Sequence, residues 1–245
     1  MDRDHFYSLM NGEGIFDYEV YLNTRQLLSC QKALSECCNR DELQFQIVHQ
    51  VEELWMKLIG FTLLDIDDYI QQENTNRVLT LFRRVQVTLQ LMTDQLILLE
   101  TMSPKEYQEI RLQLGHGSGQ ESPGFRVLLK MHQPLWDSFQ KYYLDNHNLT
   151  VEKIYDSEYS HSDAYVVAEA LAEFDELFQK FRYHHLQLIH RTIGLGAKSL
   201  KGRSVELLEN GLRVQFFPEL WQIRNRMTDA WGKQYGAVRD SVTGH

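Results

Sequence analysis

The sequence predicts an all-α protein built around a helical bundle, and three observations support this fold class. Only four of the 245 residues are proline, and glycine is absent from residues 61–114 and 125–193. Apolar residues in these stretches recur at intervals of three and four, which is the period of an amphipathic helix. Convincing alternating strands, internal repeats and linkers are missing. We therefore expect residues 1–245 to form a single all-α domain.

Four long helices are expected to form the bundle. The first begins at Glu42, and its expected apolar stripe consists of Leu43, Ile47, Val51, Leu54, Leu58, Leu63 and Ile66. The second has a stripe of Val78, Leu81, Val85, Leu89, Met92, Leu96 and Leu99. The third and fourth helices cover residues 127–143 and 164–193. Shorter helices are expected at residues 24–34, 104–114, 205–212 and 218–227.

Composition and charge limit the class of protein. Hydrophobic residues make up 43% and charged residues 24%, which is typical of a soluble globular chain. With 25 basic and 34 acidic residues the net charge is -9, so no dense cationic face is available for nucleic acid. No apolar run is long enough to span a membrane, and MDRDHFYSLM lacks the apolar core of a signal peptide. Cys30, Cys37 and Cys38 form no disulfide framework, which predicts a reduced, cytoplasmic protein.

Two segments that contain glycine interrupt the helices, at residues 115–124 and 194–202. A dinucleotide-binding fingerprint in the first would need glycine where Gln120 stands, and no predicted strand precedes it. A P-loop would need a Lys-Ser or Lys-Thr pair, and a nucleophile elbow at Ser118 would need glycine in place of His116. We interpret the first segment as a turn whose backbone amides line a pocket.

Three of the ten histidines have informative positions. Phe45 and His49 are four residues apart, so they share one face of the first long helix. His184 and His185 lie on the last long helix, and each residue taken singly is more often an ordinary core or surface histidine than a ligand. HExxH and the paired ExxH motifs of di-iron bundles are absent. A single axial histidine to haem iron remains possible, because one residue leaves no local motif.

Several segments together resemble the tryptophan 2,3-dioxygenase family. The most specific is HQVEELWMKL at residues 49–58, preceded by residues 18–22, 26–31 and 41–48. The resemblance continues in LETMSPKEY at residues 99–107 with Arg111, in Ser118–Gly119, and in Phe125–Arg126. It returns in residues 182–194 and in FFPEL at residues 216–220. The matches keep the same order as far as Arg226 and cover most of the chain.

This resemblance implies an all-α haem b oxygenase, normally a homotetramer, that uses O2 to open the indole C2–C3 bond of L-tryptophan. The expected product is of the N-formylkynurenine type. His185 matches the proximal ligand of the haem iron, and the register RxHHxxxxHRxIG favours it over His184. His49 matches the distal histidine that hydrogen-bonds the indole N–H.

The remaining site residues follow from the same resemblance. Phe45 matches an aromatic wall of the pocket, Tyr107 another substrate-pocket residue, and Arg111 the arginine that pairs with the carboxylate of the amino acid. Arginine suits that role because it can donate two parallel hydrogen bonds to a carboxylate. Tyr18, Tyr21 and Leu22 match the segment that a neighbouring subunit lends to the site in this family. Ser118 and Gly119 match the loop beside the haem.

Some positions depart from the family pattern. Gln120 replaces an aromatic residue, Leu96 replaces a tryptophan, and Ser199 is nearest to a substrate-binding threonine. These changes leave an alternative function, which is a haem-dependent monooxygenase or hydroxylase of a tryptophan-like or tyrosine-like amino acid. A third interpretation, a haem carrier or helical interaction module, would give His49 and Arg111 no role.

Overall fold

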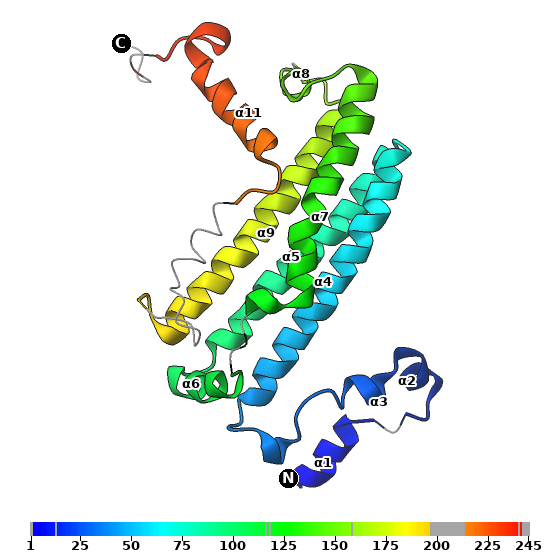
Figure 1. Ribbon diagram of the computed structural model, residues 1–245, viewed down its shortest axis with the longest axis vertical. Coiled ribbons are helices and arrows are strands. Elements are labelled where there is room, and N and C mark those ends of the chain that lie inside the picture. The colour runs from blue at the N-terminus through cyan, green and yellow to red at the C-terminus, as the bar shows by residue number, and fades with distance from the viewer. Residues whose placement is uncertain are drawn as a thin grey trace.

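The computed structural model describes residues 2–12, 14–115, 117, 119–157, 159–196, 214–239 and 241, apart from the side chains of Gln120, Trp231 and Lys233. Within these ranges every regular element is helical, so the predicted fold class is confirmed. Four long helices lie side by side as a bundle (Figure 1): α4 (Glu42–Gln71), α5 (Thr75–Glu100), α7 (Pro123–Phe139) and α9 (Asp163–Ile193).

The ends of these helices follow from local sequence. Asn74, Ser122 and Ser162 each accept a hydrogen bond from a backbone N–H of the first turn of α5, α7 and α9. Helix α9 ends at Gly194, whose φ of 92° lies in the region that favours glycine. Helix α7 continues into a π-helical turn at Gln140–Leu144.

The core of the bundle confirms one predicted stripe and corrects another. All seven residues of the stripe on α5 are buried. On α4, however, Ile47, Leu54 and Leu58 are exposed, although Leu63 and Ile66 are buried as expected. The buried face of α4 is rotated from the predicted one and consists of Glu42, Val48, Glu52, Met56, Ile59, Gly60, Thr62, Leu63, Ile66 and Ile70. The prediction failed because several apolar residues of α4, such as Ile47, Leu54 and Leu58, lie outside the face that packs on the other bundle helices, and an apolar stripe read from the sequence cannot tell such residues from buried ones.

The residues before α4 form an N-terminal arm, residues 2–41, at one end of the bundle (Figure 1). It contains α1 (Arg3–Met10), α2 (Asp17–Leu22) and α3 (Thr24–Leu27), and none of these helices buries a residue. The helix predicted at residues 24–34 is therefore wrong beyond Leu27. The second half of this segment lies against α4 instead. The backbone N–H of Lys32 donates to Gln46 Oε1 at 3.0 Å, and Gln31 Nε2 donates to Gln50 Oε1 at 2.7 Å.

Shorter helices complete the fold: α6 (Pro104–Gln113), α8 (Val151–Tyr155) and α11 (Pro218–Asp229). The fully buried carboxylate of Asp175 on α9 holds the start of α11 in place. Its Oδ2 accepts hydrogen bonds from the backbone N–H groups of Phe216 and Phe217 and from Trp221 Nε1, at 2.9, 3.2 and 2.9 Å. The helix predicted at residues 205–212 lies outside the described residues.

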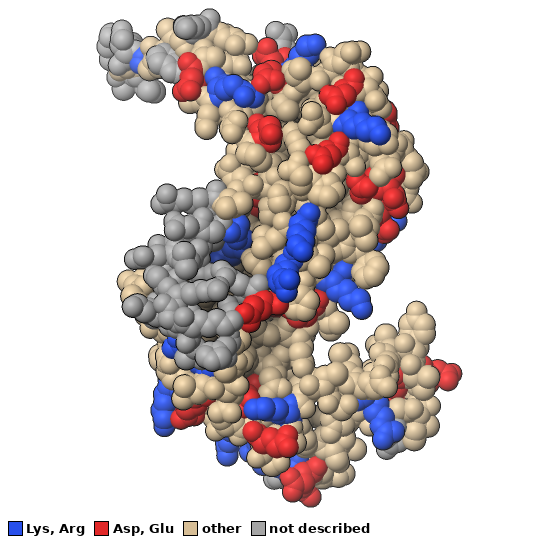
Figure 2. All heavy atoms as spheres, viewed as in Figure 1, with Lys and Arg blue, Asp and Glu red and all other residues tan. Residues whose placement is uncertain are grey.

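The surface carries both signs of charge. Figure 2 shows basic and acidic side chains interspersed over the bundle, and a mostly uncharged surface over the N-terminal arm. Among the described residues, none of the helices combines the length and apolar character that crossing a membrane requires.

Candidate functional site

Two histidines from opposite parts of the chain define the candidate site. His49 lies two turns into α4, and His185 lies in the last third of α9. Both side chains are half-buried. They are close enough that the charge of His49 contributes to lowering the pKa of His185. The fold therefore brings together His49 and His185, the two histidines that the family resemblance indicated.

His185 is the histidine of its pair that faces the protein interior, whereas His184 is exposed. Burial, followed by the effect of His49, lowers the pKa of His185 to about 4, so its imidazole is neutral at pH 7. Its ring lies against Phe181, with 6.4 Å between the ring centroids. It makes no hydrogen bond to any residue that the structure describes, so a ring nitrogen can bind a metal.

Gly119 lies beside the ring of His185, in a 3-10 turn that covers Gly119–Glu121. A Cβ at Gly119 would be 3.7 Å from Cε1 and 3.8 Å from Nε2 of His185. The backbone of this segment thus runs close to the imidazole of His185. Ser118, the other residue expected in this loop, lies outside the described residues.

His49 is held in one tautomer by the backbone of its own helix. Its Nδ1 is 2.7 Å from the carbonyl oxygen of Phe45, and a carbonyl can only accept, so Nδ1 carries the proton. Burial lowers the pKa of His49, which keeps the ring neutral at pH 7. Nε2 is therefore an acceptor. The ring centroids of Phe45 and His49 are 4.1 Å apart, so the two side chains form one continuous wall of the site.

Helix α6 places Tyr107 and Arg111 one turn apart on the same face. It begins at Ser103, whose side chain accepts from the backbone N–H of Glu106, and Pro104 occupies its first turn. The ring centroid of Tyr107 is 6.3 Å from that of Phe45, so α6 meets the site wall on α4. Burial raises the pKa of Tyr107, and the positive charge of nearby Arg111 opposes this rise. Arg111 also donates to Gln108 Oε1 at 3.4 Å.

Three of the other predicted residues lie on the exposed N-terminal arm of this chain. Tyr18 and Tyr21 on α2 are 73% and 89% exposed, and Leu22 is exposed as well. Ser199 lies outside the described residues. The assembled part of the candidate site therefore consists of Phe45, His49, Tyr107, Arg111, Gly119 and His185.

Sequence reasoning missed three residues around the site. Thr192 on α9 lies near the hydroxyl of Tyr107 and, like Arg111, opposes the rise in the pKa of that hydroxyl. Glu53, inside the recognised HQVEELWMKL segment, accepts from the backbone N–H of Gly124 at 3.0 Å and so fixes the start of α7. Glu52 on α4 is buried beside Gln95 of α5, and this burial raises the pKa of Glu52 to about 7. Glu52 and Glu53 both lie inside the HQVEELWMKL segment, which is the one signal that the sequence offered for them.

One cavity lies outside this group of residues. A cavity of about 320 Å³ lies between α9 and α11, away from the two imidazoles, and is lined by Glu169, Ala172, Glu173, Glu176, Trp221 and Arg224. Within the described part of the chain, no group of three or more His, Cys, Asp or Glu side chains is arranged to hold a metal ion.

Comparison with known proteins gives the family of the chain. A family model for tryptophan 2,3-dioxygenase matches residues 7–148, which include α4, α5 and α6. The chain is 28% identical to a tryptophan 2,3-dioxygenase of Serratia proteamaculans, covering 86% of this chain and 92% of that protein. For proteins of the same name from Myxococcus xanthus and Saccharopolyspora erythraea the identities are 30% and 29%, with 86% of this chain and 89% and 92% of theirs covered. The chain belongs to the tryptophan 2,3-dioxygenase family.

Proposed function

We propose that this protein is a haem-dependent dioxygenase that opens the indole C2–C3 bond of L-tryptophan, with both atoms of O2 entering an N-formylkynurenine-type product. The observation that carries this proposal is the pair of neutral imidazoles on α4 and α9, with Tyr107 and Arg111 of α6 beside them. The names of the matched relatives support the same reaction.

The residues around His185 fit a haem b group. A proximal ligand must be a neutral imidazole with a free lone pair, and His185 is neutral and has no described hydrogen-bond partner. Phe181 offers apolar surface beside it, and Gly119 adds no side chain there. When bound, haem iron would supply the binding and activation of O2. Ser118 is expected beside the haem from the family resemblance alone.

The other side of the site fits a tryptophan side chain and its amino acid group. Nε2 of His49 can accept a hydrogen bond from the indole N–H, because Nδ1 already carries the proton. The rings of Phe45 and Tyr107 give flat apolar surface for the indole. Arg111 would hold the carboxylate with two parallel hydrogen bonds, and Ser199 would contact the amino acid end. Holding substrate and O2 as neighbours lowers the barrier by positioning.

We propose a homotetramer in which the arm of one subunit completes the site of another. The aromatic rings of Tyr18 and Tyr21 lie open to solvent, and α1, α2 and α3 bury none of their residues. A surface of this kind gains stability when a partner covers it. The cytoplasm is the expected location, since all three cysteines are free thiols.

One preparation can test these proposals together. The protein with haem supplied is reduced without oxygen, titrated with L-tryptophan by optical spectroscopy, and then given O2 for mass analysis. We expect a product that has gained two oxygen atoms, formed by a species of tetrameric mass in light scattering. A gain of one oxygen would establish the hydroxylase alternative, and full activity in a monomer would remove the role of the arm.

Two variants of the same preparation test the haem ligand. His185→Ala should lose the Soret band of the histidine-ligated haem, whereas His184→Ala should keep it, because only His185 faces the interior. An unchanged spectrum in His185→Ala would contradict the assignment. Loss of the band in His184→Ala alone would move the ligand by one residue.

A further inference from the structure

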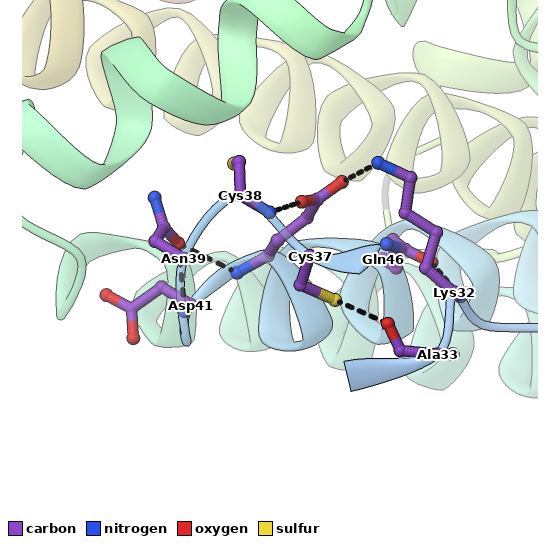
Figure 3. A network of polar contacts seen from close by, with 8 residues as sticks. Lys32, Ala33, Cys37, Cys38, Asn39, Asp41 and Gln46 are labelled. Atoms are coloured by element: carbon purple, nitrogen blue, oxygen red, sulfur yellow. Dashed lines mark hydrogen bonds and ion pairs between the residues drawn. The ribbon is translucent and has the colours of Figure 1, made fainter. Parts of the chain in front are cut away.

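One amide side chain at the end of the N-terminal arm contacts both helices of the proposed substrate site. Asn39 Oδ1 accepts from the backbone N–H groups of Asp41 and Glu42, at 3.0 and 3.2 Å. Asn39 Nδ2 donates to the carbonyl oxygen of Glu106 and to Glu109 Oε2, both at 3.0 Å. Figure 3 shows the first half of this contact, with Asn39 at the start of α4.

The partners of Asn39 fix the orientation of its amide. The backbone N–H groups of Asp41 and Glu42, at the start of α4, can only donate, and the carbonyl and carboxylate of α6 can only accept. The amide oxygen must therefore face the start of α4, and the amide nitrogen must face α6. The oxygen also acts as the cap of α4, because the side chain of Asp41, the residue in the capping position, makes no capping hydrogen bond. A carboxylate at this position could keep the two accepted hydrogen bonds, whereas the two donated to α6 need the amide nitrogen of asparagine.

Asn39 hydrogen-bonds to α6 on a face other than the one with Tyr107 and Arg111. Successive residues of an α-helix are rotated by roughly 100°, so Glu106 and Glu109 lie on a different face from Tyr107 and Arg111. Helix α6 is only 10 residues long and buries only Ile110. Helix α6 packs on α9 and places Tyr107 against the core, and the hydrogen bonds of Asn39 add a polar link from α6 to the start of α4.

We infer that Asn39 is a positioning residue, which sets α6 against α4 and thereby aligns Arg111 and Tyr107 with His49 and Phe45. Asn39 acts through α6 and touches none of these four side chains. The role in substrate binding rests on the proposed function, whereas the bridge between the two helices does not. The arm thus has a task inside its own subunit, besides the contact with a neighbour proposed for α2.

Asn39→Asp separates the two halves of the bridge. A carboxylate still accepts from the two N–H groups of α4, but it cannot donate to α6 and it repels Glu109. The matched control is Gln46→Ala, which removes the hydrogen bond from the backbone N–H of Lys32 to Gln46 and so loosens the arm without touching α6. Circular dichroism first checks that both variants keep the helix content of the wild type.

The measurement on the ligand-free protein is hydrogen exchange of residues 104–113. We expect faster exchange there in Asn39→Asp than in the wild type and Gln46→Ala, with the first turns of α4 unchanged. Equal exchange of residues 104–113 in the three proteins would overturn the inference. This measurement needs no substrate. It therefore tests whether Asn39 links α4 and α6 even if tryptophan proves not to be the substrate.

The measurement on the haem-loaded protein compares L-tryptophan with tryptamine, which lacks the carboxylate. Asn39→Asp should weaken the affinity for L-tryptophan roughly tenfold and that for tryptamine by only about twofold, because both ligands lose part of the contact with Tyr107 but only L-tryptophan also loses the pairing of its carboxylate with Arg111. A KM raised by a similar factor, with kcat nearly unchanged, should accompany it. An equal loss for both ligands would reduce Asn39 to a general structural role. Failure of the wild type to bind either ligand would contradict the proposed function instead.

Discussion

Helices α4 and α5 are consecutive neighbours of similar length, 30 and 26 residues, yet they use their sequences differently. Every apolar residue of the predicted stripe on α5 is buried. On α4 three residues of the predicted stripe are exposed, and two glutamates, Glu42 and Glu52, are buried. The apolar pattern of α5 therefore describes its packing, whereas that of α4 does not.

The difference follows from what surrounds each helix. Helix α5 packs against α4 and α9. Helix α4 also receives the arm through Glu42, whose Oε1 is 2.7 Å from Lys32 Nζ and whose Oε2 accepts from the backbone N–H of Cys38 (Figure 3). Further along, it carries His49 and holds the start of α7 through Glu53. Both helices bury polar side chains, Glu42, Glu52 and Thr62 on α4 and Thr75, Gln86 and Thr88 on α5. Helix α4 in addition carries His49 and holds the arm and the start of α7, so its apolar residues do not mark a single buried face.

The largest expected effect comes from equal truncations on the two helices. Leu89→Ala on α5 removes a fully buried side chain and should lower the free energy of unfolding by about 2–5 kcal/mol. Leu54→Ala on α4, at a side chain that is 49% exposed, should cost less than about 1 kcal/mol in the isolated subunit. Urea denaturation of both variants measures the difference. Similar losses would contradict the reassigned face of α4.

A smaller effect is expected from the buried acid on α4. Burial raises the pKa of Glu52 to about 7, from 4.5. The unfolded chain releases this proton at lower pH than the folded protein, so stability falls as the pH rises from 4.5 to 7 and stays reduced above it. Glu52→Gln should remove this decline and raise the free energy of unfolding at pH 8 by about 2–3 kcal/mol.

Denaturation at pH 5 and pH 8 checks this expectation. The control is Asp65→Asn, at an exposed carboxyl on the same helix, which should leave the pH dependence of the wild type intact. If Glu52→Gln keeps the full decline between the two pH values, another group is responsible for it.

The smallest expected effect concerns the contact of α4 with α7. A Cβ at Gly124 would lie 2.6 Å from Met56 Cβ and 2.9 Å from Glu53 Oε2, so the two helices must separate slightly to admit a methyl group. Gly124→Ala should cost about 1–2 kcal/mol, because overpacking outweighs the better helix propensity of alanine. Thermal unfolding measures this, and Gly196→Ala, at a glycine with open space beside it, is the control. An unchanged or higher melting temperature in Gly124→Ala would show that α7 is not seated tightly on α4.

The sequence alone predicted the helical class, the four long helices and the stripe on α5, since period and the lack of breakers are local properties. It could not predict which face of α4 is buried, because that depends on partners far away in the chain, such as Gln95 for Glu52. The helix at residues 24–34 failed for the same reason, since side chains of α4 hold its second half. Periodicity did not reveal the site either. Its residues came from the family resemblance, and the structure adds the tautomer of His49 and the inward orientation of His185.

The hydrogen bond from His49 to the carbonyl of Phe45 has a consequence for how the protein tolerates change. In many sites a histidine is oriented by a second side chain, and a single substitution there can disturb the ring. Here the acceptor belongs to the main chain, four residues earlier in the same helix, and is present whatever residue stands at position 45. The choice of tautomer is thereby protected against mutation. Position 45 is free to vary with the shape of the ligand while the acceptor at Nε2 of His49 is preserved.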